Sequence, residues 1–354
     1  MTDIGKIDRN LAVVSKVEDS DVIWHDVHDA PFSLHGFCCP QQKDEPFRRI
    51  PSDIAEAANP GVYRLHKRTA GGRVRFKTNS PYVAIHVEMT TLSPMPHMAF
   101  VGIMGFDMYI KSGAEQLFRG SFRPPIPLPN AYEGKLALPG GECEVTINFP
   151  LYNQVDCLLI GLQEGASLSA AAPYTHAKPV VYYGSSITQG GCASRPGTCY
   201  PAIISRWLDC DHINLGFSGS CRAEEVMARY IAELDMSVLV YDYDHNAPDD
   251  KFLRDTHEPF FRLVREKRPD LPIIFVSRPD VYLHEKMSER CLSVILETYN
   301  NALKAGDQYV DFVNGGQMFA GPFRCDCTVD GSHPTDLGFA YMAEHIAPVV
   351  KKWL

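Results

Sequence analysis

The sequence predicts two kinds of fold in one chain, an all-β sandwich followed by an α/β region with a parallel sheet. Between residues 22 and 162, short runs alternate apolar with polar or small residues between turn signals, which is typical of strands with one buried face. Beyond Lys178, apolar runs alternate with amphipathic helical patterns, and such units pack as a parallel sheet. A chain of 354 residues is also longer than one hydrophobic core usually supports. We therefore predict a sandwich domain at residues 1–170 and an α/β domain at residues 171–354.

The first region is expected to contain short strands rather than long helices. This spacing favours an antiparallel sandwich, and we expect a jelly roll. Proline is dense at residues 122–129, which excludes a central strand and favours a rigid loop between the sheets. After Leu162 the composition shifts to small residues, and we place the domain junction between residues 165 and 178. Strand runs fall at residues 74–77, 83–89, 99–110, 143–149 and 155–162.

The second region is predicted element by element from its hydrophobic periodicity. In a parallel sheet of this kind, functional residues lie beyond the carboxyl ends of the strands. Strands are expected at residues 180–183, 212–215, 237–243, 273–277 and 309–313, and helices at 200–208, 222–234, 250–267, 286–305 and from 335 onward.

Composition excludes several classes of protein. The chain is 45% hydrophobic and 22% charged, as in ordinary soluble globular proteins. A formal net charge of −9 without a dense basic run argues against nucleic acid and anionic membranes as partners. No apolar run approaches the roughly 20 residues that span a bilayer, and the N-terminus lacks a signal-peptide pattern, so a cytoplasmic protein is expected.

The cysteines predict reduced thiols and no metal site. Eleven cysteines is an odd number, and they are scattered along the chain. The pairs Cys38–Cys39 and Cys325–Cys327 lack the spacing of structural zinc ligands. We therefore expect no cofactor and no metal ligands.

Ser186 is the candidate nucleophile. It follows a buried apolar strand and Gly184, the arrangement that presents a hydroxyl at the mouth of an α/β sheet. A serine hydroxyl needs a general base and an orienting carboxylate. His333 and Asp330 lie three residues apart in a glycine-containing turn, and Pro334 restricts the backbone of His333. We predict a triad of Ser186, His333 and Asp330.

Three groups are candidate oxyanion donors. The backbone N–H of Ser186, the backbone N–H of Gly219 and the side-chain amide of Asn246 all follow predicted strands on the same rim. Taken singly, Gly219 also fits an ordinary turn, and Asn246 also fits a strand-end turn.

Four short blocks carry a family resemblance. GSSIT, FSGS, DHNA and DGSHP, in this order, resemble the blocks of the SGNH or GDSL-type hydrolases. The resemblance implies a flavodoxin-like sheet, Ser186 as nucleophile, Gly219 and Asn246 as oxyanion donors, and Asp330 with His333 completing the triad. Ser185 stands where the family has aspartate, and the block containing Asn246 departs from the family's Gly-x-Asn-Asp or Glu.

Residues 105–109, GFDMY, resemble the GxDLY signature of a subgroup with a β-sandwich in front of the hydrolase domain. Asp107 is therefore a candidate substrate contact. Arg195 is a second, because it lies near the predicted rim and could bind a sugar or carboxylate, and His245 is a third because it adjoins Asn246. For Asp107 a packed turn carboxylate, and for Arg195 a solvated loop arginine, are the simpler interpretations.

The predicted function is a serine esterase that removes a short acyl group from a carbohydrate or a small polar alcohol. Acetyl is the expected acyl group, because the sequence has no lipase-like apolar stretch. An acyltransferase and a glycan-binding protein with an inactive hydrolase domain are alternatives, and a homo-oligomer is left open. A metal hydrolase using Asp242, Asp244 and His245 is disfavoured, because alternate strand residues point to opposite faces.

Overall fold

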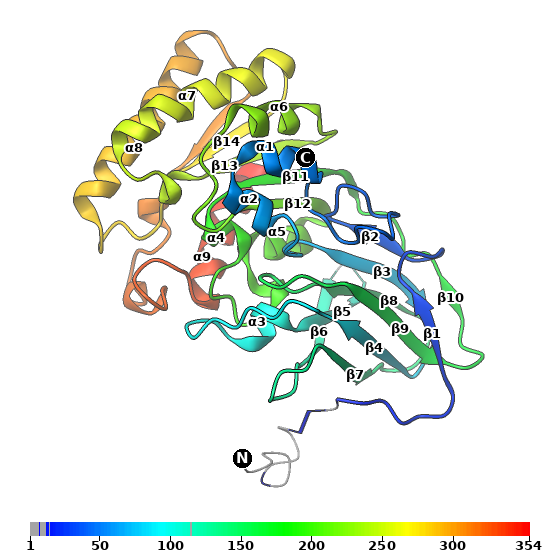
Figure 1. The fold of residues 1–354 in the computed structure, drawn as a ribbon. Coiled ribbons are helices and arrows are strands. Elements are labelled where there is room, and N and C mark those ends of the chain that lie inside the picture. The colour runs from blue at the N-terminus through cyan, green and yellow to red at the C-terminus, as the bar shows by residue number, and fades with distance from the viewer. Residues whose placement is uncertain (1–6, 8–11, 14, 114) are drawn as a thin grey trace.

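The computed structural model describes residues 7, 12–13, 15–113 and 115–354, and within them the strands form three sheets (Figure 1). Two sheets are antiparallel, with strand orders β1-β9-β4-β7 and β10-β3-β8-β5-β6, and β2 pairs with β3 in the second. Their strands are β1 Val22–Asp26, β2 Ser33–His35, β3 Arg73–Thr78, β4 Tyr82–Glu88, β5 Phe106–Ser112, β6 Glu115–Phe122, β7 Ala131–Ala137, β8 Cys143–Asn148, β9 Cys157–Gln163 and β10 Leu168–Ser169.

The third sheet is parallel, with the order β12-β11-β13-β14-β15. In chain order this is 2-1-3-4-5, the flavodoxin-like arrangement. The predicted fold class, an antiparallel β region followed by a flavodoxin-like parallel sheet, is thus confirmed. The elements are β11 His176–Gly184, β12 Cys210–Gly216, β13 Val238–Asp242, β14 Ile273–Val276 and β15 Val310–Val313, with helices α4 Ser186–Gln189, α5 Tyr200–Leu208, α6 Glu225–Glu233, α7 Asp250–Lys267, α8 Glu285–Lys304 and α9 Asp336–Lys351.

Alternate residues of the parallel strands face two separate cores. Val180 and Tyr182 of β11 belong to a cluster that includes residues of α5 and α9 and continues into the sandwich. Val181 and Tyr183 belong to the other cluster, under α6, α7 and α8. The sandwich and one face of the parallel sheet therefore share a continuous apolar core.

Helices interrupt the strand-rich first region, and here the expectation from sequence is incomplete. The run at residues 99–110, predicted as strand, is helix α3 (Phe100–Met104) followed by β5. Helices α1 (Ser52–Ala58) and α2 (Pro60–Leu65) were also not predicted. The Asn59 side chain accepts hydrogen bonds from the second and third residues of α2, and Pro60 occupies its first position, so Asn-Pro was a capping signal.

Helices α1 and α2 pack on the α/β half, although they belong to the first 170 residues of the chain, which were predicted as the sandwich domain. Ile50, Ala55, Val62 and Leu65 belong to the apolar cluster under α6 and α7. Figure 1 shows α1 beside α6 and α2 next to α1. The predicted junction, residues 165–178, covers β10, the connection to β11 and the first residues of β11. None of the helices in the described part of the chain is long and apolar enough to cross a membrane.

Arg49 connects the segment that contains α1 and α2 to the carboxyl end of β12 through hydrogen bonds. It is 1% exposed, and its guanidinium donates hydrogen bonds to the carbonyls of Asn214 (3.0 Å), Gly216 (2.6 Å), Leu65 (2.8 Å) and Arg68 (2.8 Å). No carboxylate is among these partners, and burial lowers the pKa of Arg49 to about 9.

Replacing Arg49 by alanine removes the guanidinium that donates to these four carbonyls. We expect Arg49→Ala to lower the free energy of unfolding by about 3 kcal/mol, measured by urea denaturation. Arg229→Ala, which removes an exposed helix-surface arginine, is the matched control and should cost under about 0.5 kcal/mol. Equal urea midpoints for the two variants would contradict the role given to Arg49.

Candidate active site

Ser186 begins helix α4 directly after strand β11, at the rim formed by the carboxyl ends of the parallel strands. The turn is tight because Gly184 lacks a side chain: a Cβ there would lie 2.0 Å from Thr188 Oγ1 and 2.1 Å from the carbonyl oxygen of Asp242. The Ser185 hydroxyl accepts a hydrogen bond from the N–H of Ile187 (3.1 Å). Ser185 therefore caps α4, and Ser186 faces the site half-buried.

The structure brings Ser186, His333 and Asp330 into one hydrogen-bonded row. His333 Nε2 lies 2.8 Å from Ser186 Oγ, and His333 Nδ1 lies 2.7 Å from Asp330 Oδ2. The other carboxylate oxygen of Asp330 accepts from the backbone N–H groups of His333 (2.8 Å) and Ser332 (3.1 Å). A serine, an imidazole and a carboxylate in this geometry can transfer the serine proton to the imidazole while the carboxylate stabilises the resulting cation.

The turn that carries Asp330 and His333 is held on both sides. The N–H of Val329 donates to the carbonyl of His333 (2.9 Å), and the N–H of Thr335 donates to that of Cys327 (2.8 Å). Partial burial of Asp330 opposes its ionisation, but hydrogen bonds from the backbone and ring of His333 outweigh this and lower the pKa of Asp330. The carboxylate is therefore ionised at neutral pH, as the orienting group of a triad needs to be.

The predicted oxyanion donors come from loops that adjoin α4. Gly219 has φ +66°, a conformation that favours glycine. Asn246 Nδ2 donates to the carbonyl of Phe217 (3.0 Å), which ties its turn to the loop of Gly219 and leaves its second amide hydrogen for another acceptor. Gln189 Oε1 accepts from the N–H of Ser218 (3.0 Å), which joins the same loop to α4.

The sandwich contributes a contact to the nucleophile that the sequence did not reveal. Tyr152 Oη donates to the carbonyl oxygen of Ser186 (3.1 Å). Next to it, Gln189 Nε2 donates to the carbonyl of Leu151 (3.1 Å). Residues 151 and 152 follow β8 in an irregular segment without a recognisable motif, so no local signal pointed to them.

Asp107 lies inside the protein and is not placed to contact a substrate. It is fully buried, and its carboxylate accepts from Asn148 Nδ2, the N–H of Gly197 and Arg195 Nη1, each at 2.8 Å. Arg195 is committed to the same cluster, with its guanidinium 4.0 Å from the centre of the Phe118 ring and bonded to the Tyr109 hydroxyl. The GFDMY segment therefore joins the sandwich to the loop after α4.

His245 is also buried, behind the rim. Its Nε2 lies 3.2 Å from Asp280 Oδ1, and its Nδ1 lies 3.4 Å from Asp244 Oδ1 without hydrogen-bond geometry. Burial alone would lower its pKa, but the two carboxylates raise the pKa of His245 to about 9. An ion pair therefore lies next to Asn246, and the His245 imidazole is engaged within the protein.

The expectation that strand alternation keeps Asp242, Asp244 and His245 apart is wrong. Ligand atoms of Asp242, Asp244 and His245 lie within 4.8 Å of one another. Strand alternation does not separate them, because β13 ends at Asp242 and the next two residues belong to the 3₁₀ turn Asp244–Asn246. The atoms have protein partners, however. Tyr200 and Thr188 donate to Asp242, and the N–H of Arg278 donates to Asp244 (3.0 Å).

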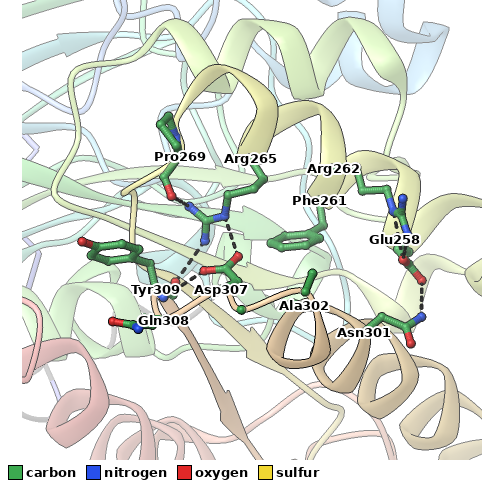
Figure 2. A pocket seen from close by; sticks show the side chains of 12 residues that line it. Glu258, Phe261, Arg262, Arg265, Pro269, Asn301, Ala302, Asp307, Gln308 and Tyr309 are labelled. Atoms are coloured by element: carbon green, nitrogen blue, oxygen red, sulfur yellow. Dashed lines mark hydrogen bonds and ion pairs between the residues drawn. The ribbon is translucent and has the colours of Figure 1, made fainter.

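A separate hollow of about 430 Å³ lies between α7 and α8, and Figure 2 shows its lining. Pro269 and Tyr309 border it just before β14 and β15 begin, so it lies at the amino ends of the strands, opposite the rim of Ser186. Arg265 within it is paired with Asp307 at 2.7 Å.

Two family models match the chain. The GDSL-like Lipase/Acylhydrolase family matches residues 177–351, and the N-terminus of Esterase_SGNH_hydro-type, called GxDLY, matches residues 22–168. Together they cover most of the sequence, and the chain belongs to the GDSL-like lipase/acylhydrolase family, with the GxDLY region in front. It is an acylesterase of the SGNH type. No curated protein matches it in sequence.

Solved structures show the same architecture. A protein from Bacteroides ovatus ATCC 8483, named as a GDSL-like lipase, is 29% identical with a TM-score of 0.84, over 94% of this chain and 97% of that one. Salicylyl-acyltransferase SsfX3 from a tetracycline biosynthetic pathway is 21% identical with a TM-score of 0.75, over 94% and 99%. An acetyl xylan esterase from the rumen bacterium Butyrivibrio proteoclasticus is 14% identical with a TM-score of 0.58, over 94% and 98%.

The ion pair of His245 makes stability depend on pH. Its pKa in the folded protein, about 9, is above the unfolded value of about 6.5. Its contribution is therefore fully present below about pH 6.5 and is lost as pH rises through 9. We expect the wild-type free energy of unfolding to fall by about 3 kcal/mol over this window relative to His245→Gln, measured by urea denaturation at a series of pH values. Parallel pH curves for the two proteins would contradict this.

Proposed function

We propose that the protein is a serine esterase that removes a short acyl group, acetyl in the first instance, from a carbohydrate or a small polar alcohol. The observation that carries the proposal is the row of Ser186, His333 and Asp330 at 2.8 and 2.7 Å. Membership of an acylhydrolase family and likeness in fold to an acetyl xylan esterase support it.

In the proposed reaction, Ser186 Oγ attacks the ester carbonyl carbon and its proton passes to His333 Nε2. Asp330 stabilises the imidazolium. The negative charge on the carbonyl oxygen is held by the N–H groups of Ser186 and Gly219 and by the Asn246 amide. The C–O bond to the alcohol breaks, and the alcohol takes the proton from His333. Water, deprotonated by His333, then attacks the acyl-enzyme, and the carboxylic acid and free Ser186 are released.

The Ser186→Ala variant tests the mechanism. We expect it to lower the turnover of p-nitrophenyl acetate by at least about 10³-fold, because the acyl-enzyme can no longer form. The wild type should be labelled by a fluorophosphonate at Ser186, and the variant should not be labelled.

Ser185→Ala is the matched control. Ser185 is the adjacent serine, and its hydroxyl caps α4, so this variant should keep fluorophosphonate labelling and lose only about 1 kcal/mol of stability. Retained turnover in Ser186→Ala, or labelling of Ser185, would overturn the proposal. Release of acetate from acetylated mono- and oligosaccharides, compared between wild type and Ser186→Ala, would identify the alcohol.

Acyl transfer is the second candidate, supported by the likeness in fold to salicylyl-acyltransferase over nearly the whole of both chains. The same acyl-enzyme would then be attacked by a sugar or metabolite hydroxyl in place of water. We expect hydrolysis to dominate. Products from p-nitrophenyl acetate, separated by mass spectrometry in the presence of candidate acceptor alcohols, decide between them: a new acetyl ester that replaces most of the acetate would favour the transferase.

A further inference from the structure

A second set of side chains converges on the proposed catalytic pair. His97, Cys192, Asp330 and His333 each offer one ligand atom, and these four atoms lie within 4.8 Å of one another. His97 belongs to the segment between β4 and α3, and Cys192 to the loop after α4. The rings of His97 and His333 have their centres 5.9 Å apart, and Cys192 Sγ lies 3.4 Å from the carbonyl oxygen of His97. The reaction described above uses neither His97 nor Cys192.

The donor set suits zinc. Imidazole nitrogen, thiolate sulfur and carboxylate oxygen are the protein ligands of Zn²⁺, at about 2.0–2.3 Å. In a tetrahedral site these bond lengths separate neighbouring ligand atoms by about 3.3–3.8 Å. Side-chain movements of about 1 Å therefore suffice to close the group around an ion. His97 and Asp330 are exposed, which gives an ion access and gives both side chains room to move.

We propose that His97, Cys192, Asp330 and His333 form an inhibitory zinc site. On binding, the Cys192 thiol gives its proton to solvent and its sulfur bonds to Zn²⁺, with no change of oxidation state. The bound Zn²⁺ ion occupies a nitrogen of the His333 imidazole. The same ion binds the Asp330 carboxylate, which then no longer accepts the hydrogen bond from the His333 ring. His333 then no longer acts as base for Ser186. The inhibition rests on the proposed function, whereas the binding of the metal does not.

The chemistry of the ligands predicts which ions inhibit. Mg²⁺ and Ca²⁺ prefer sets made of oxygen ligands, so neither should compete for a site of two imidazoles, a thiolate and one carboxylate. The other group, Asp242, Asp244 and His245, is a weaker candidate because these residues are already bonded to Tyr200, Arg278 and Asp280.

The experiment measures zinc binding and activity separately, on the full chain. Isothermal titration with ZnCl₂ should show one site in the wild type, and Zn²⁺ should inhibit hydrolysis of p-nitrophenyl acetate at the same concentration, with EDTA restoring the rate. We expect Cys192→Ser and His97→Ala each to weaken Zn²⁺ binding and inhibition by at least about 10-fold, while the rate without zinc stays within about 2-fold of the wild type.

Matched controls are Cys325→Ser and His284→Ala, which remove an exposed thiol and an exposed imidazole elsewhere. Both should bind and respond to Zn²⁺ as the wild type does. Unchanged zinc affinity in His97→Ala would overturn the site, and because His97 is exposed this variant keeps its fold. If the protein binds one Zn²⁺ and loses it in both site variants but hydrolyses no ester, the site stands and the proposed function fails.

Discussion

The hydrogen bond from Ser186 to His333 joins segments 147 residues apart, and the rest of the structure determines whether these atoms meet. β11 delivers Ser186 to the rim at a glycine that leaves no space for a side chain. The turn before α9 positions His333, and backbone hydrogen bonds from Val329 to His333 and from Thr335 to Cys327 hold this turn. Two short, separately braced turns are therefore set at the same edge of one sheet, and the sheet order 2-1-3-4-5 places them there.

The sandwich is part of this support. Tyr152 contacts the backbone of Ser186, and Asp107 holds Arg195 and the N–H of Gly197 in the loop that follows α4. One apolar cluster runs from the antiparallel sheets to α9. The GxDLY region thus acts on the site through packing and hydrogen bonds to the backbone. Asp107 is fully buried and accepts three hydrogen bonds, which explains why a carboxylate belongs at this position of the signature.

Local patterns predicted the α/β half well and the contacts between the halves poorly. Helix α7 begins and ends where its amphipathic pattern predicts, at Asp250–Lys267, because Asp249 caps it and the pattern is continuous. Ser186, His333 and Asp330 could be placed on one rim because parallel strands align their carboxyl ends. Helix α3 was missed because its residues are apolar on all sides and give no period. Arg49 and Tyr152 were missed because each reaches a distant backbone carbonyl, that of Asn214 for Arg49 and that of Ser186 for Tyr152, which no local sequence window contains. The buried position of Asp107 likewise depends on partners from two distant segments, β8 and the loop after α4.

The Arg49 guanidinium has a consequence for recombination between relatives. It crosses from the first half to carbonyls at the end of β12, so the two halves are bonded through groups that every amino acid possesses. Main-chain acceptors do not change with sequence as long as the strand end keeps its path. A chimera that takes its parallel sheet from a distant homologue can therefore retain this junction, whereas the contact of Asp107 with Arg195 is preserved only if both parents carry that pair.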